Sequence, residues 1–313
     1  MAAAASAAPA PGRSGAGSRS KITIPIVQGR KGGPKLTMVT AYDFPGARLA
    51  EAAEVDLILV GDSVANVVLG YETTTRVTLD DMIHHTKAVA RAKPQALLVV
   101  DMPWMTFHVS PEDTLKNAAR LIREGGAEAV KLEGGANRVE MVRRLVSAEI
   151  PVMGHIGLTP QSVLSAGGYQ IQGRKLEEAQ AMIKDAQALE EAGVFALVLE
   201  GVPAILGQII TQKVQIPTIG IGAGPDTDGQ VLVMHDLLGL NFGHYPRFVR
   251  RYAEFADQGV AALRLWIEDV RRGSFPGAEE SYQMIDAAAL ELLERSSGDH
   301  SDRSLAAQGS VLP

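Results

Sequence analysis

The chain has 313 residues, of which 46% are hydrophobic and 21% are charged, and it contains no cysteine. This composition excludes a wholly disordered protein, a scaffold held by disulfides and a metal domain built on cysteine ligands. The formal net charge is −6 and no long block of one sign occurs, so no nucleic-acid partner is expected.

The first twenty residues consist mainly of alanine, serine, glycine and proline, and contain no leucine, isoleucine, valine or phenylalanine. They therefore lack the apolar segment of a secretory signal. Because they are basic and free of acidic residues, an organelle transit peptide is an alternative. We expect residues 1–20 to be a disordered leader and the protein to be cytoplasmic.

Short apolar runs recur along the rest of the chain. They predict eight strands, at residues 36–40, 56–60, 96–100, 129–132, 151–153, 195–199, 217–221 and 230–234. Runs that are apolar on both faces are typical of parallel strands, because helices cover one side of the sheet and other side chains fill the opposite side. None approaches the roughly 20 residues of a membrane-spanning helix, so we expect no membrane partner.

Helix-like segments separate the predicted strands. Residues 78–93 open with threonine and acidic residues, and residues 110–124 start with Ser-Pro-Glu-Asp, which is typical of an N-cap serine followed by proline in the first turn. Residues 176–192 carry apolar side chains at helical spacing. Strands that alternate with helices predict a parallel sheet.

Eight such alternations suggest a (β/α)8 TIM barrel over residues 21–277, with an open, doubly wound sheet as the alternative. A barrel carries polar residues at the carboxyl ends of many strands, whereas an open sheet concentrates them at one switch point. Polar residues follow every predicted strand, which favours the barrel. Residues 278–313 are expected to form a helical extension and a disordered tail.

Three carboxylates, Asp62, Asp101 and Glu133, follow the second, third and fourth predicted strands. On adjacent barrel strands they would converge on one mouth, where so much like charge needs protons or a cation. Since the ligands are oxygens and cysteine is absent, Mg²⁺ is the expected ion. Each acid alone is explained equally well as a cap of the following helix, but three at equivalent positions favour a metal site.

Lys131 and Glu200 add a cation and a fourth acid to the strand ends. Lys131 lies two residues before Glu133, so both side chains point to the same face of their strand, where the lysine suits a substrate carboxylate. A Schiff-base lysine would need a lowered pKa, which neighbouring acids oppose. Glu200 follows an apolar run, which indicates a general base, with a helix cap or a salt bridge as the alternative.

Several longer motifs resemble the ketopantoate hydroxymethyltransferase family. They occur in the family's order between residues 21 and 277 and read GDSVANVVLGY, VDMPWMTF, VKLEGG, GHIGLTPQSV followed by GGYQIQGR, LEGVP and IGIGAGPDTDGQVLVMHDLLG. The resemblance implies a barrel of the phosphoenolpyruvate mutase/isocitrate lyase type, the use of Mg²⁺ and assembly as a homodecamer. Gly201, where some relatives carry cysteine, is a small departure from the family pattern.

The resemblance also implies roles for individual residues of the first three motifs. In the family the acids of these motifs surround the magnesium ion, which implies Asp62, Asp101 and Glu133 as metal ligands. The family's aspartate–serine pair and the lysine of K-x-E-G-G hold the keto acid. This implies Asp62, Ser63 and Lys131 as substrate-binding residues, with Asp101 beside them.

The later motifs imply the remaining roles and the reaction. The glutamate of L-E-x-V-P is the family's proton acceptor, which implies Glu200 as the catalytic residue, and the histidine of G-H-x-G-L-T-P implies His155 as a residue of the substrate pocket. The implied reaction transfers a hydroxymethyl group from 5,10-methylenetetrahydrofolate to 3-methyl-2-oxobutanoate. It gives 2-dehydropantoate and tetrahydrofolate and belongs to pantothenate biosynthesis.

Two other functions are alternatives. A carbon–carbon lyase or mutase of the same superfamily would act on a related 2-oxo acid, but such a lyase ordinarily uses a cysteine, and this chain has none. A barrel without catalysis would serve as a binding scaffold, but it would be expected to have lost at least one of the acids or the lysine named above. We therefore expect a transferase whose partners are the keto acid, the folate and further copies of itself.

Overall fold

The fold is described from a computed structural model that covers residues 19–162, 170–243, 245–282, 284 and 286–298. The chain divides into two compact units, Met1–Glu254 and Phe255–Pro313. The predicted leader lies outside the described residues up to position 18, and the predicted tail does so from position 299. The limits of 21–277 for the barrel stay a prediction.

The first unit is a closed barrel of eight parallel strands in sequential order. The strands are β1 (Leu36–Thr40), β2 (Leu57–Val60), β3 (Leu97–Asp101), β4 (Ala129–Glu133), β5 (Val152–Gly157), β6 (Ala196–Glu200), β7 (Thr218–Ile221) and β8 (Gly229–Leu232). β1 pairs with β8 as well as with β2, with Met38 opposite Val231, so the sheet has no free edge. The predicted barrel is confirmed, and the open sheet is wrong.

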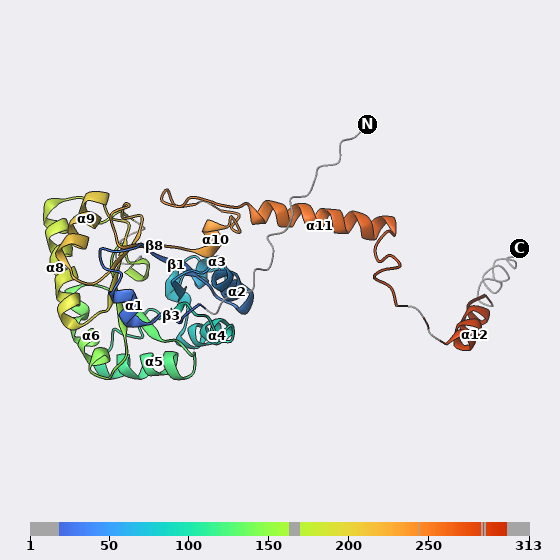
Figure 1. The fold of residues 1–313 in the computed structure, drawn as a ribbon, viewed down its shortest axis with the longest axis horizontal. Helices are drawn as coiled ribbons and strands as arrows, with labels where there is room; N and C mark the ends of the chain where they lie inside the picture. Colours follow the sequence, from blue (N-terminus) through green and yellow to red (C-terminus); the bar gives the residue numbers. More distant parts are fainter. Residues whose placement is uncertain (1–18, 163–169, 244, 283, 285, 299–313) are drawn as a thin grey trace, which may run out of the picture. The chain divides into compact units, whose positions relative to one another are not determined.

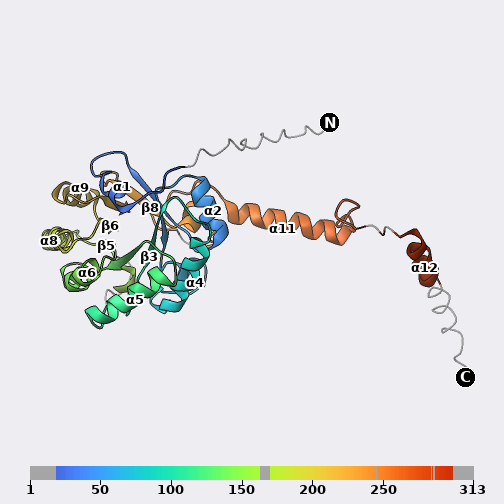
Figure 2. The ribbon, with the colours of Figure 1, turned by 60° about the horizontal axis from the view of Figure 1, so that its bottom comes forward.

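Helices connect most of the strands and surround the barrel, as Figures 1 and 2 show. Those of the first unit are α1 (Ile24–Gln28), α2 (Phe44–Ala52), α3 (Val64–Val67), α4 (Leu79–Ala90), α5 (Pro111–Arg123), α6 (Val139–Val146), α8 (Leu176–Ala192), α9 (Ala204–Lys213) and α10 (Met234–Leu237). Short 3-10 turns are η1 (Thr74–Arg76), η2 (Ala136–Arg138) and η3 (Pro160–Ser162). The predicted alternation is confirmed except between β7 and β8, where the described residues 222–228 form no helix.

Two of the three predicted helices, α4 and α5, begin directly after a capping side chain. Thr78 forms a capping box with Asp81 at the start of α4, and the Ser110 hydroxyl accepts a hydrogen bond from Asp113 N at the start of α5, with proline in the first turn. These side chains satisfy backbone N–H groups that have no partner inside the helix. α8 spans the predicted residues 176–192.

The end of β8 differs from its prediction. The strand ends at Leu232, whereas the apolar run continues to Met234, which is the first residue of α10. Met234 N donates a hydrogen bond to the Thr40 hydroxyl at 3.0 Å, so this residue bonds a side chain of β1 instead of continuing the ladder. The apolar character of the run does not predict this hydrogen bond, and it therefore does not predict where the strand ends.

The apolar core has two parts, because the two faces of each strand point to different places. One set of buried side chains fills the barrel, including Leu57, Val99 and Ile219. The other set faces outward and packs with buried helix residues, including Ile58 on β2 and Met82 on α4. Burial on both sides explains why the strands read as continuous apolar runs.

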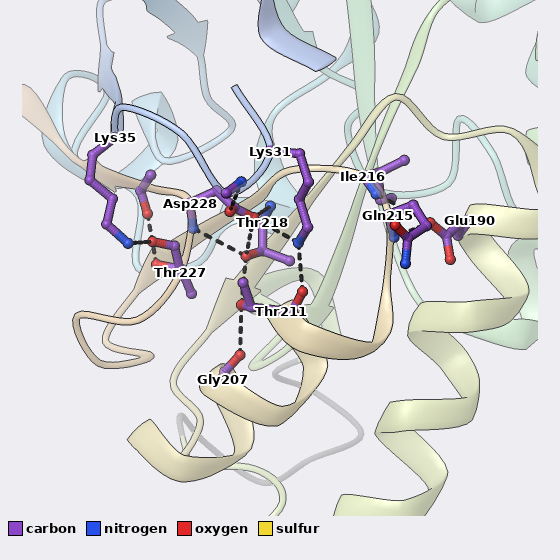
Figure 3. Close-up of polar contacts among 12 residues, drawn as sticks. Lys31, Lys35, Glu190, Gly207, Thr211, Gln215, Ile216, Thr218, Thr227 and Asp228 are labelled. Carbon is purple, nitrogen blue, oxygen red and sulfur yellow. Dashed lines mark hydrogen bonds and ion pairs between the residues drawn. The ribbon is translucent and has the colours of Figure 1, made fainter. Parts of the chain in front are cut away.

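A polar network lies at the amino ends of β7 and β8, shown in Figure 3. The Asp228 carboxylate accepts hydrogen bonds from Thr218 N and Gly32 N, both at 2.9 Å, and it pairs with the Lys31 ammonium at 2.9 Å. Lys31 also donates to the carbonyl oxygen of Thr211 on α9. These contacts join the segment after α1 to the closing strands of the barrel.

The second unit contains α11 (Phe255–Arg272) and α12 (Ala287–Gly298). None of the eighteen residues of α11 is buried, and its exposed side chains include Leu263, Leu265 and Trp266. Across the described part of the chain, no helix combines the length and the apolar character that crossing a bilayer requires.

Replacing Asp228 by asparagine should destabilise the barrel. Burial raises the pKa of Asp228, but hydrogen bonds from Thr218 and Gly32 and the Lys31 charge outweigh it, so the pKa is lowered. We expect Asp228→Asn to lower the free energy of unfolding by about 2–3 kcal/mol, the usual loss for hydrogen bonds to a charged group. Urea denaturation at pH 7 measures this change, with the exposed Asp226→Asn as the matched control.

The effect of Asp228→Asn should depend on pH in one direction. A lowered pKa contributes stability above the unfolded-state value of about 3.9, and that contribution is lost as the pH falls through the folded-state pKa. The difference between wild type and variant should therefore shrink below about pH 4. A difference that is the same at pH 7 and at low pH would contradict this account.

Gly157, the last residue of β5, should not tolerate a side chain. Its φ is +98°, and a Cβ atom would lie 2.2 Å from the carbonyl oxygen of Glu200 on β6. Gly70 has a similar φ of +71° with no atom within 4 Å of an added Cβ, so Gly70→Ala isolates the cost of the backbone conformation. We expect Gly70→Ala to lower the free energy of unfolding by about 1 kcal/mol and Gly157→Ala by at least about 2 kcal/mol more, measured by urea denaturation. Equal losses would show that the clash at Gly157 is relieved.

Candidate active site

A cavity of about 1300 Å³ opens at the carboxyl ends of the strands. It is lined by all seven residues that the sequence analysis selected: Asp62, Ser63, Asp101, Lys131, Glu133, His155 and Glu200. The prediction that they share one mouth is therefore correct in position, while their individual roles stay predictions.

Strand alternation explains why most of these side chains reach the cavity. Val99, Met153 and Val198 belong to the cluster that fills the barrel, and each is followed two residues later by a site residue on the same strand. Because side chains two apart point to one face, the polar residues form the top layer of the barrel interior. Asp62 and Ser63 follow the end of β2.

The acids and the lysine are in direct contact. Asp101 Oδ2 accepts a hydrogen bond from Asp62 N at 2.9 Å, and Asp101 Oδ1 lies 2.9 Å from Lys131 Nζ. Lys131 Nζ also lies 3.1 Å from His155 Nδ1. All four residues are at most 4% exposed, so the charges interact with little screening by water.

This crowding shifts the protonation of the buried groups. Burial and the negative charges of Asp101 and Glu133 raise the pKa of Asp62 well above its ordinary value. Burial opposes protonation of Lys131, but the charges of Asp101, Glu133 and Asp62 outweigh it and raise the lysine pKa. Lys131 therefore stays an ammonium, which suits anion binding and opposes a Schiff-base role.

His155 connects two glutamates across the cavity. Its Nδ1 lies 3.5 Å from Glu133 Oε1, and its Nε2 lies 3.3 Å from Glu200 Oε2. Burial and the Lys131 charge oppose protonation of the imidazole, but hydrogen bonds to the two glutamates outweigh them and raise its pKa to about 9. Lys131 Nζ lies nearer to Asp101 Oδ1, at 2.9 Å, than to His155 Nδ1, at 3.1 Å, so the ammonium pairs most closely with Asp101.

Tyr42 supports Ser63 from beneath. The Tyr42 hydroxyl lies 2.8 Å from the Ser63 hydroxyl, and the ring is 2% exposed. Burial raises the pKa of Tyr42, although the hydrogen bond to Ser63 opposes this, so the phenol keeps its proton. The contact restricts the orientation of the Ser63 hydroxyl. The sequence analysis does not predict this contact between Tyr42 and Ser63.

Gln161 is the residue of this site that sequence reasoning missed. It lies in η3 after β5, is 5% exposed, and contacts two of the three predicted metal ligands. Its amide nitrogen donates to Asp62 Oδ2 at 2.8 Å, and its backbone N donates to Glu133 Oε2 at 3.1 Å. The only signal in the sequence is that Gln161 belongs to the motif GHIGLTPQSV.

The donor set suits a hard cation, although no metal cluster is preformed. In the part of the chain that the structure describes, no group of three or more histidine, cysteine, aspartate or glutamate side chains forms a metal-holding cluster as placed. The acids offer only oxygen ligands, which magnesium prefers. Asp101 Oδ1 is buried and, within the residues that the structure describes, accepts no well-aligned hydrogen bond, although the Lys131 ammonium lies 2.9 Å away. The three acids therefore fit Mg²⁺ because their ligand atoms are oxygens and because one of these, Asp101 Oδ1, lacks a well-aligned hydrogen-bond partner among the described residues.

The cavity extends beyond this polar cluster. Its lining includes Asp236 on α10, Asn241 and the aromatic rings of Phe242 and Phe248. The Asn241 amide donates to the Asp236 carboxylate, whose pKa is raised by burial. The space leaves room for a second, larger reactant next to the acids.

The sequence matches a known family along most of its length. The profile described as Ketopantoate hydroxymethyltransferase matches residues 21–278. A 3-methyl-2-oxobutanoate hydroxymethyltransferase of Moorella thermoacetica is 56% identical over 266 residues, which cover 85% of this chain and 99% of the relative. One of Pelobacter propionicus is 54% identical and covers 84% and 98%.

Solved structures agree on the fold. 2,3-dimethylmalate lyase, described as a PEP mutase/isocitrate lyase superfamily member, has a TM-score of 0.52 at 18% identity, covering 92% of this chain and 97% of that one. Phosphonopyruvate hydrolase in complex with oxalate and Mg²⁺ has a TM-score of 0.55 at 14% identity, covering 91% and 98%. These similarities show the barrel fold alone. The family rests on the sequence matches, which show that the chain belongs to the ketopantoate hydroxymethyltransferase family.

Proposed function

We propose that this enzyme transfers a hydroxymethyl group from 5,10-methylenetetrahydrofolate to 3-methyl-2-oxobutanoate in pantothenate biosynthesis. One water is taken up, and the products are 2-dehydropantoate and tetrahydrofolate. The observation that carries the proposal is that Glu200, a candidate base, shares one cavity with Lys131 and three acids suited to binding a 2-oxo acid with a cation.

The keto acid would bind at the ends of β2, β3 and β4. Asp62, Asp101 and Glu133 would hold magnesium, which when bound supplies positive charge where the keto oxygen becomes negative. The Lys131 ammonium would attract the substrate carboxylate, and the Ser63 hydroxyl, held by Tyr42, would donate a hydrogen bond to the same substrate. These contacts orient the substrate with its C3 hydrogen toward β6.

Glu200 would accept the proton from C3. The Glu200 side chain is 15% exposed, more than the buried acids beneath it, so it can meet a bound substrate. The His155 Nε2 contact at 3.3 Å orients the carboxylate. Once the proton has moved to Glu200, the C3 carbon forms a bond to the methylene carbon, and both bonds from that carbon to the folate nitrogens break. Water supplies the hydroxyl of the transferred unit, and the two folate nitrogens take one proton from that water and one from Glu200.

Replacing Glu200 by glutamine should stop proton removal without preventing substrate binding. In D₂O without folate, wild-type enzyme should exchange the C3 hydrogen of 3-methyl-2-oxobutanoate, and Glu200→Gln should slow this exchange by about 10²–10⁴-fold, the usual contribution of a general base. Proton NMR of the substrate measures the rate. Glu191→Gln, on the exposed part of α8, is the matched control and should exchange at the wild-type rate. A Glu200→Gln rate equal to wild type would exclude Glu200 as the base.

Product formation should require all three components. We expect 2-dehydropantoate from 3-methyl-2-oxobutanoate, methylenetetrahydrofolate and Mg²⁺, no product when the folate is omitted, and loss of product when a chelator is added and its recovery with excess Mg²⁺. Mass spectrometry detects the product.

Cleavage of a 2-oxo acid in the absence of folate would contradict the transferase and favour the lyase instead. The homodecamer, which the family resemblance implies, and the cytoplasmic location, which the absence of a secretory signal favours, stay predictions.

A further inference from the structure

Gln161 bridges strand ends that are far apart in the sequence. Its side-chain amide nitrogen donates to Asp62 Oδ2 at 2.8 Å and to the carbonyl oxygen of Met102, just after β3, at 3.0 Å. Its backbone N donates to Glu133 Oε2 at the end of β4. One residue of the segment after β5 therefore contacts groups at the ends of β2, β3 and β4.

These contacts fix the orientation of the acids. The amide nitrogen donates to two acceptors, a carboxylate and a backbone carbonyl. These acceptors determine the orientation of the amide, because the amide oxygen cannot donate a hydrogen bond to either of them. Each carboxylate is bonded to Gln161 through one oxygen, Oδ2 of Asp62 and Oε2 of Glu133. The second oxygen of each acid is thereby held in a defined direction.

Only one end of the Gln161 amide is bonded. Among the described residues, no group donates a hydrogen bond to Gln161 Oε1, although this oxygen is buried. The amide nitrogen bonds two acceptors, and an apolar side chain of the same length would leave both Asp62 Oδ2 and the Met102 carbonyl oxygen without this donor. The amide is therefore explained by the groups that its nitrogen contacts and not by apolar packing.

We propose that Gln161 is a positioning residue that orients Asp62 and Glu133 so that each presents one oxygen to the magnesium ion. The inference rests on the proposed magnesium site. Hydrogen bonds to metal-binding carboxylates restrict their motion, so less ordering is needed when the ion binds, and loss of such outer contacts typically weakens metal affinity 10–100-fold. Gln161 itself contacts neither substrate nor folate in this role.

The test is magnesium binding to protein stripped of metal, measured by isothermal titration calorimetry. Gln161→Met keeps the length of the side chain and the backbone contact to Glu133 but removes the amide donor to Asp62 and to the Met102 carbonyl oxygen. We expect its Kd for Mg²⁺ to rise about 10–100-fold. Gln187→Met, at an exposed position of α8, should bind like wild type. Thermal unfolding without magnesium shows whether each variant is folded.

A second variant keeps the test decisive if the methionine protein does not fold. Gln161→Asn retains the amide but is one methylene too short to reach Asp62 Oδ2, so it should also weaken Mg²⁺ binding. Unchanged affinity in a folded variant would overturn the proposal, and tighter binding would do so as well, because it would show that the amide competes with the ion. If wild-type protein binds no Mg²⁺, the proposed metal site fails, which is a different outcome from failure of the role of Gln161.

Discussion

The site depends on one constraint, the burial of several carboxylates side by side. Asp62, Asp101 and Glu133 are at most 5% exposed, and Lys131 supplies one ammonium among them. Removing each ion from water costs several kcal/mol unless charges and hydrogen bonds replace the water. Lys131 and a protonated His155 supply two positive charges, which cannot neutralise four carboxylates, those of these three acids and of Glu200. Burial and this excess negative charge raise the pKa of Asp62, and a bound divalent cation would balance the charge.

The balance of charges differs between the two ends of the barrel. At the amino ends of the strands, Asp228 is matched by Lys31 and by backbone N–H groups, so its charge is balanced and its pKa is lowered. At the carboxyl ends the acids outnumber the cations, and the pKa of Asp62 is raised. The first arrangement stabilises the fold, whereas the second stores unfavourable charge that a ligand can relieve. This matches the general division of barrel enzymes between a stabilising and a reactive face.

The sequence was sufficient for features that follow from strand periodicity. Lys131 and Glu133 share a face because they are two residues apart, and each polar strand end could be found from the apolar run before it. The contacts of Gln161 depend on the path of a loop, which periodicity does not describe. The predicted end of β8 was wrong, because Met234 N donates a hydrogen bond to the hydroxyl of Thr40, a residue distant in sequence. His155 was placed in the pocket by family resemblance, and its contacts depend on strand register.

That register explains how the base is linked to the buried charges. Glu133 lies opposite His155 between β4 and β5, whereas Glu200 lies opposite Gly157, two residues further along β5. The imidazole therefore contacts one glutamate beside it and another one layer higher. The lower layer is closed to water, and the Glu200 side chain is 15% exposed to the cavity. His155 is therefore the side chain that lies between the buried acids and the more exposed Glu200, 3.5 Å from Glu133 Oε1 and 3.3 Å from Glu200 Oε2.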